Sequence, residues 1–218
     1  MSFERFTGIS KNLFQAINQF RSRKTASKVI AQEIARLLDV KDILQGVQYA
    51  AVGGIASQEY GSSRETHDID ILIRNKDSDL VQSRLTQNGF NKIGPITLDM
   101  GSGTSYEDGS GLNIDVIELS DAWVHDALQR VHIGNQGLPI VPIDTYVFMK
   151  LLIGRGKDLV DVLDAIRVMG KDKATQISDK VVELLKNQGY DDAVMDWYTA
   201  IAEVTGDWSL FQEAIQMP

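Results

Sequence analysis

One stretch of the chain, residues 49–74, restricts the possible folds more than any other. It reads YAAVGGIASQEYGSSRETHDIDILIR, an apolar run, two glycines, a short helical pattern, a polar loop and a second apolar run with two acids. Side chains two positions apart on a strand share one face, so a strand that begins at Asp68 presents Asp68 and Asp70 side by side. The predicted elements are a strand over 48–52, a helix over 55–60 and a strand over 68–73.

These residue types favour a particular chemistry. Two carboxylates held side by side repel each other unless a cation lies between them, and ligands made only of oxygen suit a hard ion such as Mg²⁺. Gly53 and Gly54 leave backbone N–H groups bare at the end of the first strand, where a phosphate can approach closely. The stretch therefore indicates metal-dependent chemistry on a phosphate group. The alternative is an ordinary polar loop that enters an ordinary strand.

A third acid lies on a later predicted strand, 112–119. Asp115 is flanked there by Ile114 and Val116, and a lone acid among apolar residues is costly unless it is paired or bound to a metal. Glu118 is expected to face elsewhere. The alternative for Asp115 is a salt bridge at the end of the strand.

Composition excludes several classes of protein. Among 218 residues there is no cysteine, so neither a disulfide framework nor a thiolate metal site is possible, which fits a cytoplasmic protein. There is no window of 18 uninterrupted apolar residues and no visible secretory signal, which argues against a membrane protein. The net charge of −8 argues against nonspecific binding of nucleic acid.

One segment runs against this acidic balance. Residues 11–32 contain no acid, and their basic residues are Lys11, Arg21, Arg23, Lys24 and Lys28. The basic segment Lys11–Lys28 is either a surface that meets RNA or another polyanion, or a solvated helical face.

The remaining pattern predicts an α+β protein with a helical end. Helices are expected over 10–45, 76–87 and 123–131, and the glycine-rich stretch 88–110 is interpreted as hairpin turns with weak strand signals. Gly154 and Gly156 should separate two helices, and the chain after 174 is helical by periodicity. The expected units are 1–46 (N-terminal helices), 47–143 (αβ core) and 144–218 (helical part).

The spacing of these residues resembles a known signature. Val52-Gly53-Gly54 followed by Asp68-Ile69-Asp70-Ile71 resembles the nucleotidyltransferase superfamily related to DNA polymerase beta. The lead-in RETH over 64–67, and a helical Lys150 followed by Lys157-Asp158-x-x-Asp161, are similar to AbiEii-type and minimal bacterial nucleotidyltransferases. The resemblance implies a small mixed β-sheet with flanking helices and a helical C-terminal part.

The resemblance also implies roles for the residues. Asp68, Asp70 and Asp115 would hold two Mg²⁺ ions, with Mn²⁺ as a substitute, and Asp115 would take a proton. Binding of the nucleotide falls to Gly53, Gly54, Ser57 and Arg64, with Lys150 and Lys157 offsetting charge and with Asp158 and Asp161 orienting the lysine or lining the pocket. Residues Lys157 and Asp161 are also spaced as an ordinary i, i+4 surface pair.

The implied reaction transfers a nucleoside monophosphate from an NTP, such as ATP, to an acceptor. The acceptor is RNA, protein or a small molecule, and an AbiEii-type enzyme would act as a toxin with an antitoxin partner. The alternatives are a catalytically silent nucleotidyltransferase fold that acts as a binding, antitoxin or regulatory module, and a phosphohydrolase that uses the same metal centre.

Overall fold

A computed structural model describes residues 40–98 and 101–214 of the chain. Most of the helical pattern predicted over 10–45, and the whole basic segment Lys11–Lys28, lie outside the described residues. Of the predicted N-terminal unit, residues 40–46 are described, and residues 40–43 are helical.

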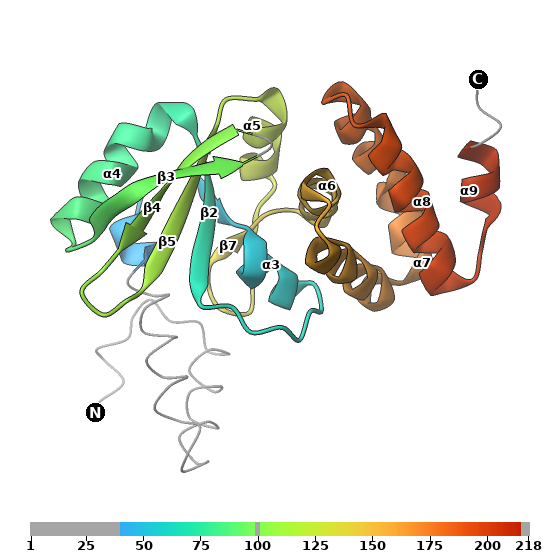
Figure 1. Ribbon diagram of the computed structural model, residues 1–218, viewed down its shortest axis with the longest axis horizontal. Coiled ribbons are helices and arrows are strands. Elements are labelled where there is room, and N and C mark those ends of the chain that lie inside the picture. Colours follow the sequence, from blue (N-terminus) through green and yellow to red (C-terminus); the bar gives the residue numbers. More distant parts are fainter. Residues whose placement is uncertain (1–39, 99–100, 215–218) are drawn as a thin grey trace, which may run out of the picture.

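A mixed sheet forms the centre of the described chain (Figure 1). Its strands run in the order β3-β4-β5-β2-β1-β7-β6. The neighbours β2 and β5, and β1 and β7, are parallel, whereas the other neighbours are antiparallel. The strands are β1 (Tyr49–Ala51), β2 (Asp68–Arg74), β3 (Asn91–Leu98), β4 (Gly101–Glu107), β5 (Asn113–Leu119), β6 (His132–Ile133) and β7 (Pro139–Ile140). The prediction of an α+β fold with a mixed sheet is confirmed.

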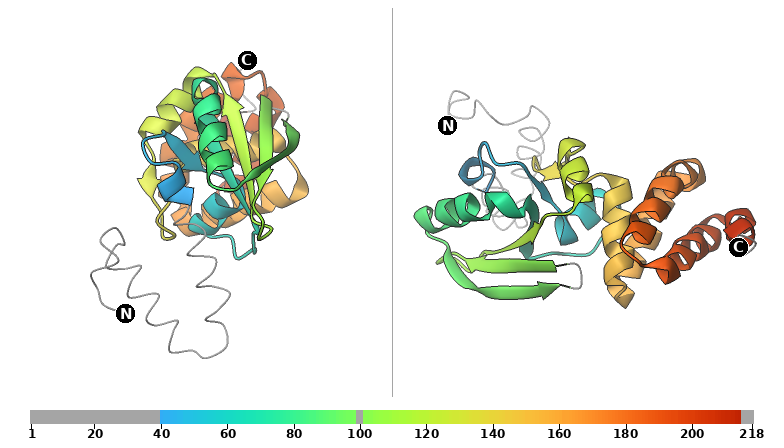
Figure 2. Two further views of the ribbon diagram at one scale, coloured as in Figure 1. Left: turned by 90° about the vertical axis from the view of Figure 1, so that its left-hand side faces the viewer. Right: turned by 90° about the horizontal axis from the view of Figure 1, so that it is seen from above.

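One face of the sheet is covered by helix α4 (Ser78–Gln87), which follows the short 3-10 turn η2 (Asn75–Asp77). Ser78 Oγ donates to Glu118 Oε2 at 2.8 Å, so Glu118 and its strand neighbours of the same parity face α4. The prediction that Glu118 faces away from Asp115 is confirmed. Figure 2 shows α4 and α5 (Ala122–Gln129) on one side of the sheet, and the β3–β4 ribbon toward the other.

The β3–β4 hairpin confirms the weak strand signals within residues 88–110 and corrects the interpretation of the stretch as mainly turns. Strands β3 and β4 pair with each other, with Gly103 opposite Ile96. A Cβ at Gly103 would lie 2.5 Å from the Val116 carbonyl oxygen and 2.7 Å from Ile96. The glycine is therefore a site of close approach inside a strand, rather than a turn residue.

Helices make up the second half of the described chain, to the right of the sheet in Figure 1. They are α6 (Ile143–Ile153), α7 (Gly156–Asn187), α8 (Asp191–Thr205) and α9 (Ser209–Ala214), whereas the seven-residue α3 (Gly53–Glu59) connects β1 to β2. Gly154 ends α6 in the left-handed region at φ 63°, so the predicted break at the glycines is confirmed. No described helix is both long and apolar enough to cross a bilayer. The division into three units stays a prediction.

Candidate active site

Asp70 and Asp115 are direct neighbours on the face of the sheet opposite α4. Strands β2 and β5 are parallel and in register, with Asp70 opposite Asp115 and Asp68 opposite Asn113. Residues in one register row point to the same face, and Asp68 lies two residues before Asp70, so the three carboxylates share that face. Asp68 is exposed, while Asp70 and Asp115 are half-buried.

The surroundings of Asp70 disfavour its charged form. Burial raises its pKa, and the charges of Asp115 and Asp68 raise it further, against the opposing effects of the Gly54 N–H and of Lys150. Within residues 40–98 and 101–214, Asp70 forms no ion pair. A carboxylate in these surroundings is stabilised by a cation that reaches both strands.

These donors fit a hard divalent cation in kind, because all three are carboxylate oxygens on one face. Their placement does not form a metal site by itself, because no group of three or more His, Cys, Asp or Glu in the described chain is arranged so that it could hold a metal ion. An ion at this face would therefore take its remaining ligands from water or from a substrate, as Mg²⁺ commonly does.

The two glycines form a tight corner against Asp70. Gly53 has φ +54°, and a Cβ there would lie 1.8 Å from Asp70 Oδ2. A Cβ at Gly54 would lie 2.2 Å from Thr66 Oγ1, and the Gly54 N–H donates to Asp70 Oδ2 at 3.4 Å. The prediction that both N–H groups are bare is wrong for Gly54, because α3 begins at Gly53 and turns this N–H toward the acid.

We expect Gly53→Ala to damage both the fold and the site. A left-handed φ costs a residue with a Cβ about 1–2 kcal/mol, and the added carbon must also push Asp70 aside. The matched control is Gly156→Ala, because a Cβ at Gly156 meets no atom within 4 Å in the first turn of α7. Urea unfolding should show a loss of stability for Gly53→Ala alone, and equal stability of the two variants would contradict the geometry of the corner.

A buried ion-pair network joins α6 to α7 beside this corner. Lys150 Nζ lies 3.0 Å from Asp158 Oδ1 and 2.7 Å from Asp161 Oδ2, with Lys150 only 5% exposed. Burial alone would raise the pKa of both carboxylates. The bonds from Arg155 to Asp158, and from Lys150 to Asp161, instead lower the pKa of each below its usual value.

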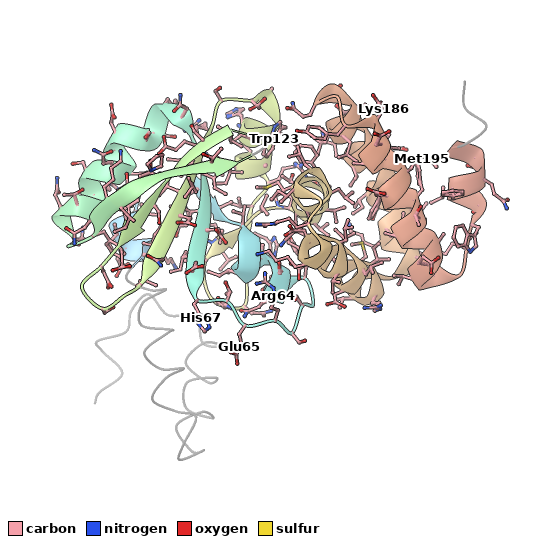
Figure 3. All side chains as sticks on the ribbon, viewed as in Figure 1. Arg64, Glu65, His67, Trp123, Lys186 and Met195 are labelled. Carbon is pink, nitrogen blue, oxygen red and sulfur yellow. The ribbon has the colours of Figure 1, made fainter. Side chains whose placement is uncertain are left out.

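Two arginines extend the network toward the surface. Arg155 Nε lies 2.6 Å from Asp158 Oδ2, and Arg64 Nη2 lies 3.6 Å from Asp161 Oδ2. Figure 3 shows Arg64 on the loop that precedes β2, while Glu65 on the same loop points outward. Lys150, Arg155 and Arg64 thus all contact these two carboxylates.

The structure separates the two predicted lysines. Lys150 is buried and held by both acids, whereas Lys157 is exposed and forms no ion pair within the described residues. The predicted surface pair between Lys157 and Asp161 is therefore absent from the described chain. Asp158 and Asp161 both contact Lys150, as the role of orienting the lysine requires, and their role in lining a nucleotide pocket stays a prediction.

Ser57 is buried, and its hydroxyl is already engaged. Ser57 Oγ lies 2.8 Å from the Gly53 carbonyl oxygen and 3.0 Å from Asp161 Oδ2, and it accepts a hydrogen bond from Tyr146 Oη at 3.0 Å. Its role toward a phosphate stays a prediction that requires this bonding to change. Sequence reasoning missed Tyr146, because a tyrosine inside an apolar helical run looks like an ordinary core residue.

A cavity of about 470 Å³ lies elsewhere, on the α4 side of the sheet. Its lining includes Asp42, Arg84, Phe90 and Leu112, and none of the three carboxylates. It therefore does not mark the acidic centre.

A comparison with one solved structure, ANT(2'')-Ia, agrees with this fold. No family model and no curated protein matches the chain. Among solved structures, ANT(2'')-Ia in complex with adenylyl-2''-tobramycin is 14% identical with a TM-score of 0.50, and the match covers 74% of this chain and 100% of that chain. Lincomycin-bound LnuA, a lincosamide antibiotic adenylyltransferase, is 16% identical with a TM-score of 0.39, covering 62% of this chain and 94% of its own.

The chain shares its fold with ANT(2'')-Ia. At 14% identity the likeness concerns the fold, which is the nucleotidyltransferase-like α+β fold expected from the sequence. The particular closeness to AbiEii-type proteins stays a prediction.

Proposed function

We propose that the protein is a nucleotidyltransferase that moves a nucleoside monophosphate from an NTP to an acceptor and releases pyrophosphate. One observation carries the proposal. Asp70 and Asp115 are register neighbours on the face of the sheet opposite α4, with Asp68 beside them, and the Gly53-Gly54 corner closes onto Asp70. Acids that repel each other are kept together where a cation and a phosphate are to be bound.

Asp68, Asp70 and Asp115 would hold the divalent ions, two Mg²⁺ with Mn²⁺ as a substitute, which supply activation of the acceptor hydroxyl and neutralisation of the triphosphate. Asp115 would also accept the proton of the acceptor. The neighbours Ile69, Ile71, Ile114 and Val116 are buried and keep the interior behind this face dry, which strengthens electrostatic interactions there.

The nucleotide would lie between the glycine corner and helices α6 and α7. In this arrangement Gly53, Gly54 and Ser57 would bind the phosphates, and Lys150 would offset part of their charge once it is released from its acids. Lys157 is exposed and Arg64 is 42% exposed, so both side chains are able to turn toward the leaving pyrophosphate. Charge stabilisation of this kind is commonly the largest contribution to phosphoryl transfer.

The acceptor remains one of three classes: RNA, protein or a small molecule. A small-molecule acceptor is supported by the fold shared with ANT(2'')-Ia, whose crystal structure contains adenylyl-2''-tobramycin. An AbiEii-like toxin that acts with an antitoxin partner is also part of the proposal. The proposed location is the cytoplasm, in keeping with the lack of cysteine.

A silent binding or regulatory module is the second candidate, and one observation favours it. Lys150 is buried between Asp158 and Asp161, so its charge is already neutralised in this arrangement. A partner or substrate that separates Lys150 from one of these acids would then be needed before the lysine acts on a phosphate.

Transfer of label from NTP tests the proposal directly. Purified protein is incubated with Mg²⁺, each α-labelled NTP in turn and a cell extract, and the labelled fraction is identified as RNA, protein or small molecule. We expect Asp115→Asn to lose at least about a hundredfold in rate, the usual scale for the loss of one charged group that acts in the transition state. Glu118→Gln, on the same strand and the opposite face, should keep the wild-type rate.

Two results would contradict the proposal in different ways. Release of free NMP or phosphate without a labelled acceptor would indicate a hydrolase. Equal rates for Asp115→Asn and Glu118→Gln would show that the acidic face takes no part in the reaction.

A further inference from the structure

Two buried hydroxyls meet where α3, α6 and α7 come together. Tyr146 is 2% exposed and Ser57 is 1% exposed, and Tyr146 Oη donates to Ser57 Oγ at 3.0 Å. Both belong to helices, but to parts of the chain 89 residues apart. Neither hydroxyl has access to solvent, so each depends on its protein partners for its hydrogen bonds.

The number of hydroxyl protons determines which hydrogen bonds the two side chains can donate and accept. A serine hydroxyl has one proton and two lone pairs. Ser57 Oγ accepts a hydrogen bond from Tyr146 Oη. Its own hydroxyl donates a hydrogen bond either to the Gly53 carbonyl oxygen at 2.8 Å or to Asp161 Oδ2 at 3.0 Å. Asp161 is an anion paired with Lys150, and hydrogen bonds to a charged acceptor are the stronger ones. Ser57 is therefore held from α6 and from α7 at once.

The first turn of α3 connects these hydrogen bonds at Ser57 to Asp70. Ser57 lies one turn after Gly53, and Gly53 packs so closely on Asp70 Oδ2 that a Cβ there would overlap it at 1.8 Å. The Gly54 N–H points at the same oxygen from 3.4 Å. A displacement at the beginning of α3 therefore acts directly on the position and hydrogen bonding of the Asp70 carboxylate.

We propose that Tyr146 is a positioning residue, which holds Ser57 and so fixes the Gly53-Gly54 corner against Asp70. Tyr146 does not contact the reacting atoms in this arrangement, because its hydroxyl donates its hydrogen bond to Ser57. The effect on transfer rests on the proposed function, whereas the effect on the corner does not.

Amide hydrogen exchange tests the positioning without any reaction. In the full chain, Tyr146→Phe should speed exchange of the backbone amides of α3 about tenfold, because the variant removes one of the buried hydrogen bonds that hold Ser57. The matched control is Tyr60→Phe. Tyr60 Oη donates to the Val141 carbonyl oxygen at 2.6 Å, and its ring lies 4.9 Å from that of Tyr146.

The two variants remove the same atom from adjacent rings, so a general loosening would affect both. The proposal requires faster exchange at Gly54 and Ser57 in Tyr146→Phe, and wild-type exchange at these amides in Tyr60→Phe. Wild-type exchange in Tyr146→Phe, or equal acceleration in both variants, would overturn it.

A double-mutant cycle then tests the link to transfer. Tyr146→Phe should lower kcat about tenfold with the KM for NTP changed less than about twofold, and adding it to Ser57→Ala should cost no further rate. Additive losses would show that Tyr146 acts by another route. If the wild-type protein transfers no nucleotide, the proposed function fails, and the exchange experiment alone still decides whether Tyr146 holds the corner.

Discussion

Replacement of Asp70 by asparagine is expected to abolish nucleotide transfer and, at the same time, to stabilise the protein in the absence of metal. Asp70 is half-buried, and burial together with the charges of Asp115 and Asp68 disfavours its ionised form. The neutral amide removes this repulsion while keeping the shape. Transfer should fall by about a thousandfold, because loss of metal-supported charge stabilisation is worth several kcal/mol.

The pH dependence of stability separates this effect from a general one. Asp70 has a raised pKa in the folded protein, so the folded state favours its protonated form. Its stabilising contribution is therefore complete below the ordinary carboxyl pKa, and it is lost as the pH rises through the folded value. Urea unfolding without metal should show Asp70→Asn and wild type equally stable at acidic pH, with the variant increasingly more stable toward neutral pH.

Added Mg²⁺ and NTP should reverse the order. A ligand that binds only the folded state raises the melting temperature, and Asp70→Asn should lose this increase. Glu118→Gln serves as the control, since it changes an acid on the opposite face and should keep the response to ligand. A variant less stable than wild type at neutral pH without metal would show that repulsion at Asp70 is not significant.

Replacement of Lys150 by methionine is expected to have the largest effect on stability. Lys150 neutralises Asp158 and Asp161, which are 0% and 2% exposed. Breaking a buried pair by removing one partner typically costs about 3–5 kcal/mol, and here Asp161 loses its closest cation and keeps only Arg64 at 3.6 Å. For a chain of this size that corresponds to a fall of about 6–20 °C in melting temperature.

The control for this prediction is Lys157→Met, which removes the same charge from an exposed side chain without an ion pair in the described part of the chain. It should change the free energy of unfolding by less than about 0.5 kcal/mol. Equal losses for the two variants would contradict the assignment of Lys150 to a buried network.

Acid pH gives this prediction a second readout. The pKa values of Asp158 and Asp161 are lowered in the wild type, so their contribution to stability is present above the ordinary carboxyl pKa and is lost as the pH falls through the folded values. In Lys150→Met the cost should be largest at neutral pH, and it should shrink on acidification, when protonation removes the carboxylate charges that Lys150 pairs with in the wild type.

Local patterns were sufficient to predict the elements around the acids. Alternation in DIDILIR and in NIDVIEL predicts two strands with their acids on one face, and the structure places these strands side by side in register. Gly154 and Gly156 predict the break between α6 and α7, because a left-handed glycine ends a helix.

Other features depend on contacts that a single sequence does not display. Glycines at 101 and 103 indicate turns by composition, yet here they allow β4 to approach Leu119 and Val116 closely. Gly54 is expected to offer a free N–H, but the start of α3 at Gly53 directs it to Asp70. The Tyr146–Ser57 bond joins residues 89 apart, so no local pattern predicts it.

We propose that Asp70 and Asp115 share a divalent cation beside the Gly53-Gly54 corner. Crystals grown with Mn²⁺ and a non-hydrolysable NTP analogue, measured at the manganese absorption edge, would locate this ion. We expect an anomalous peak in contact with both carboxylates and with the phosphates of the analogue. A peak elsewhere, or a nucleotide bound with the two carboxylates turned apart and no ion between them, would contradict it.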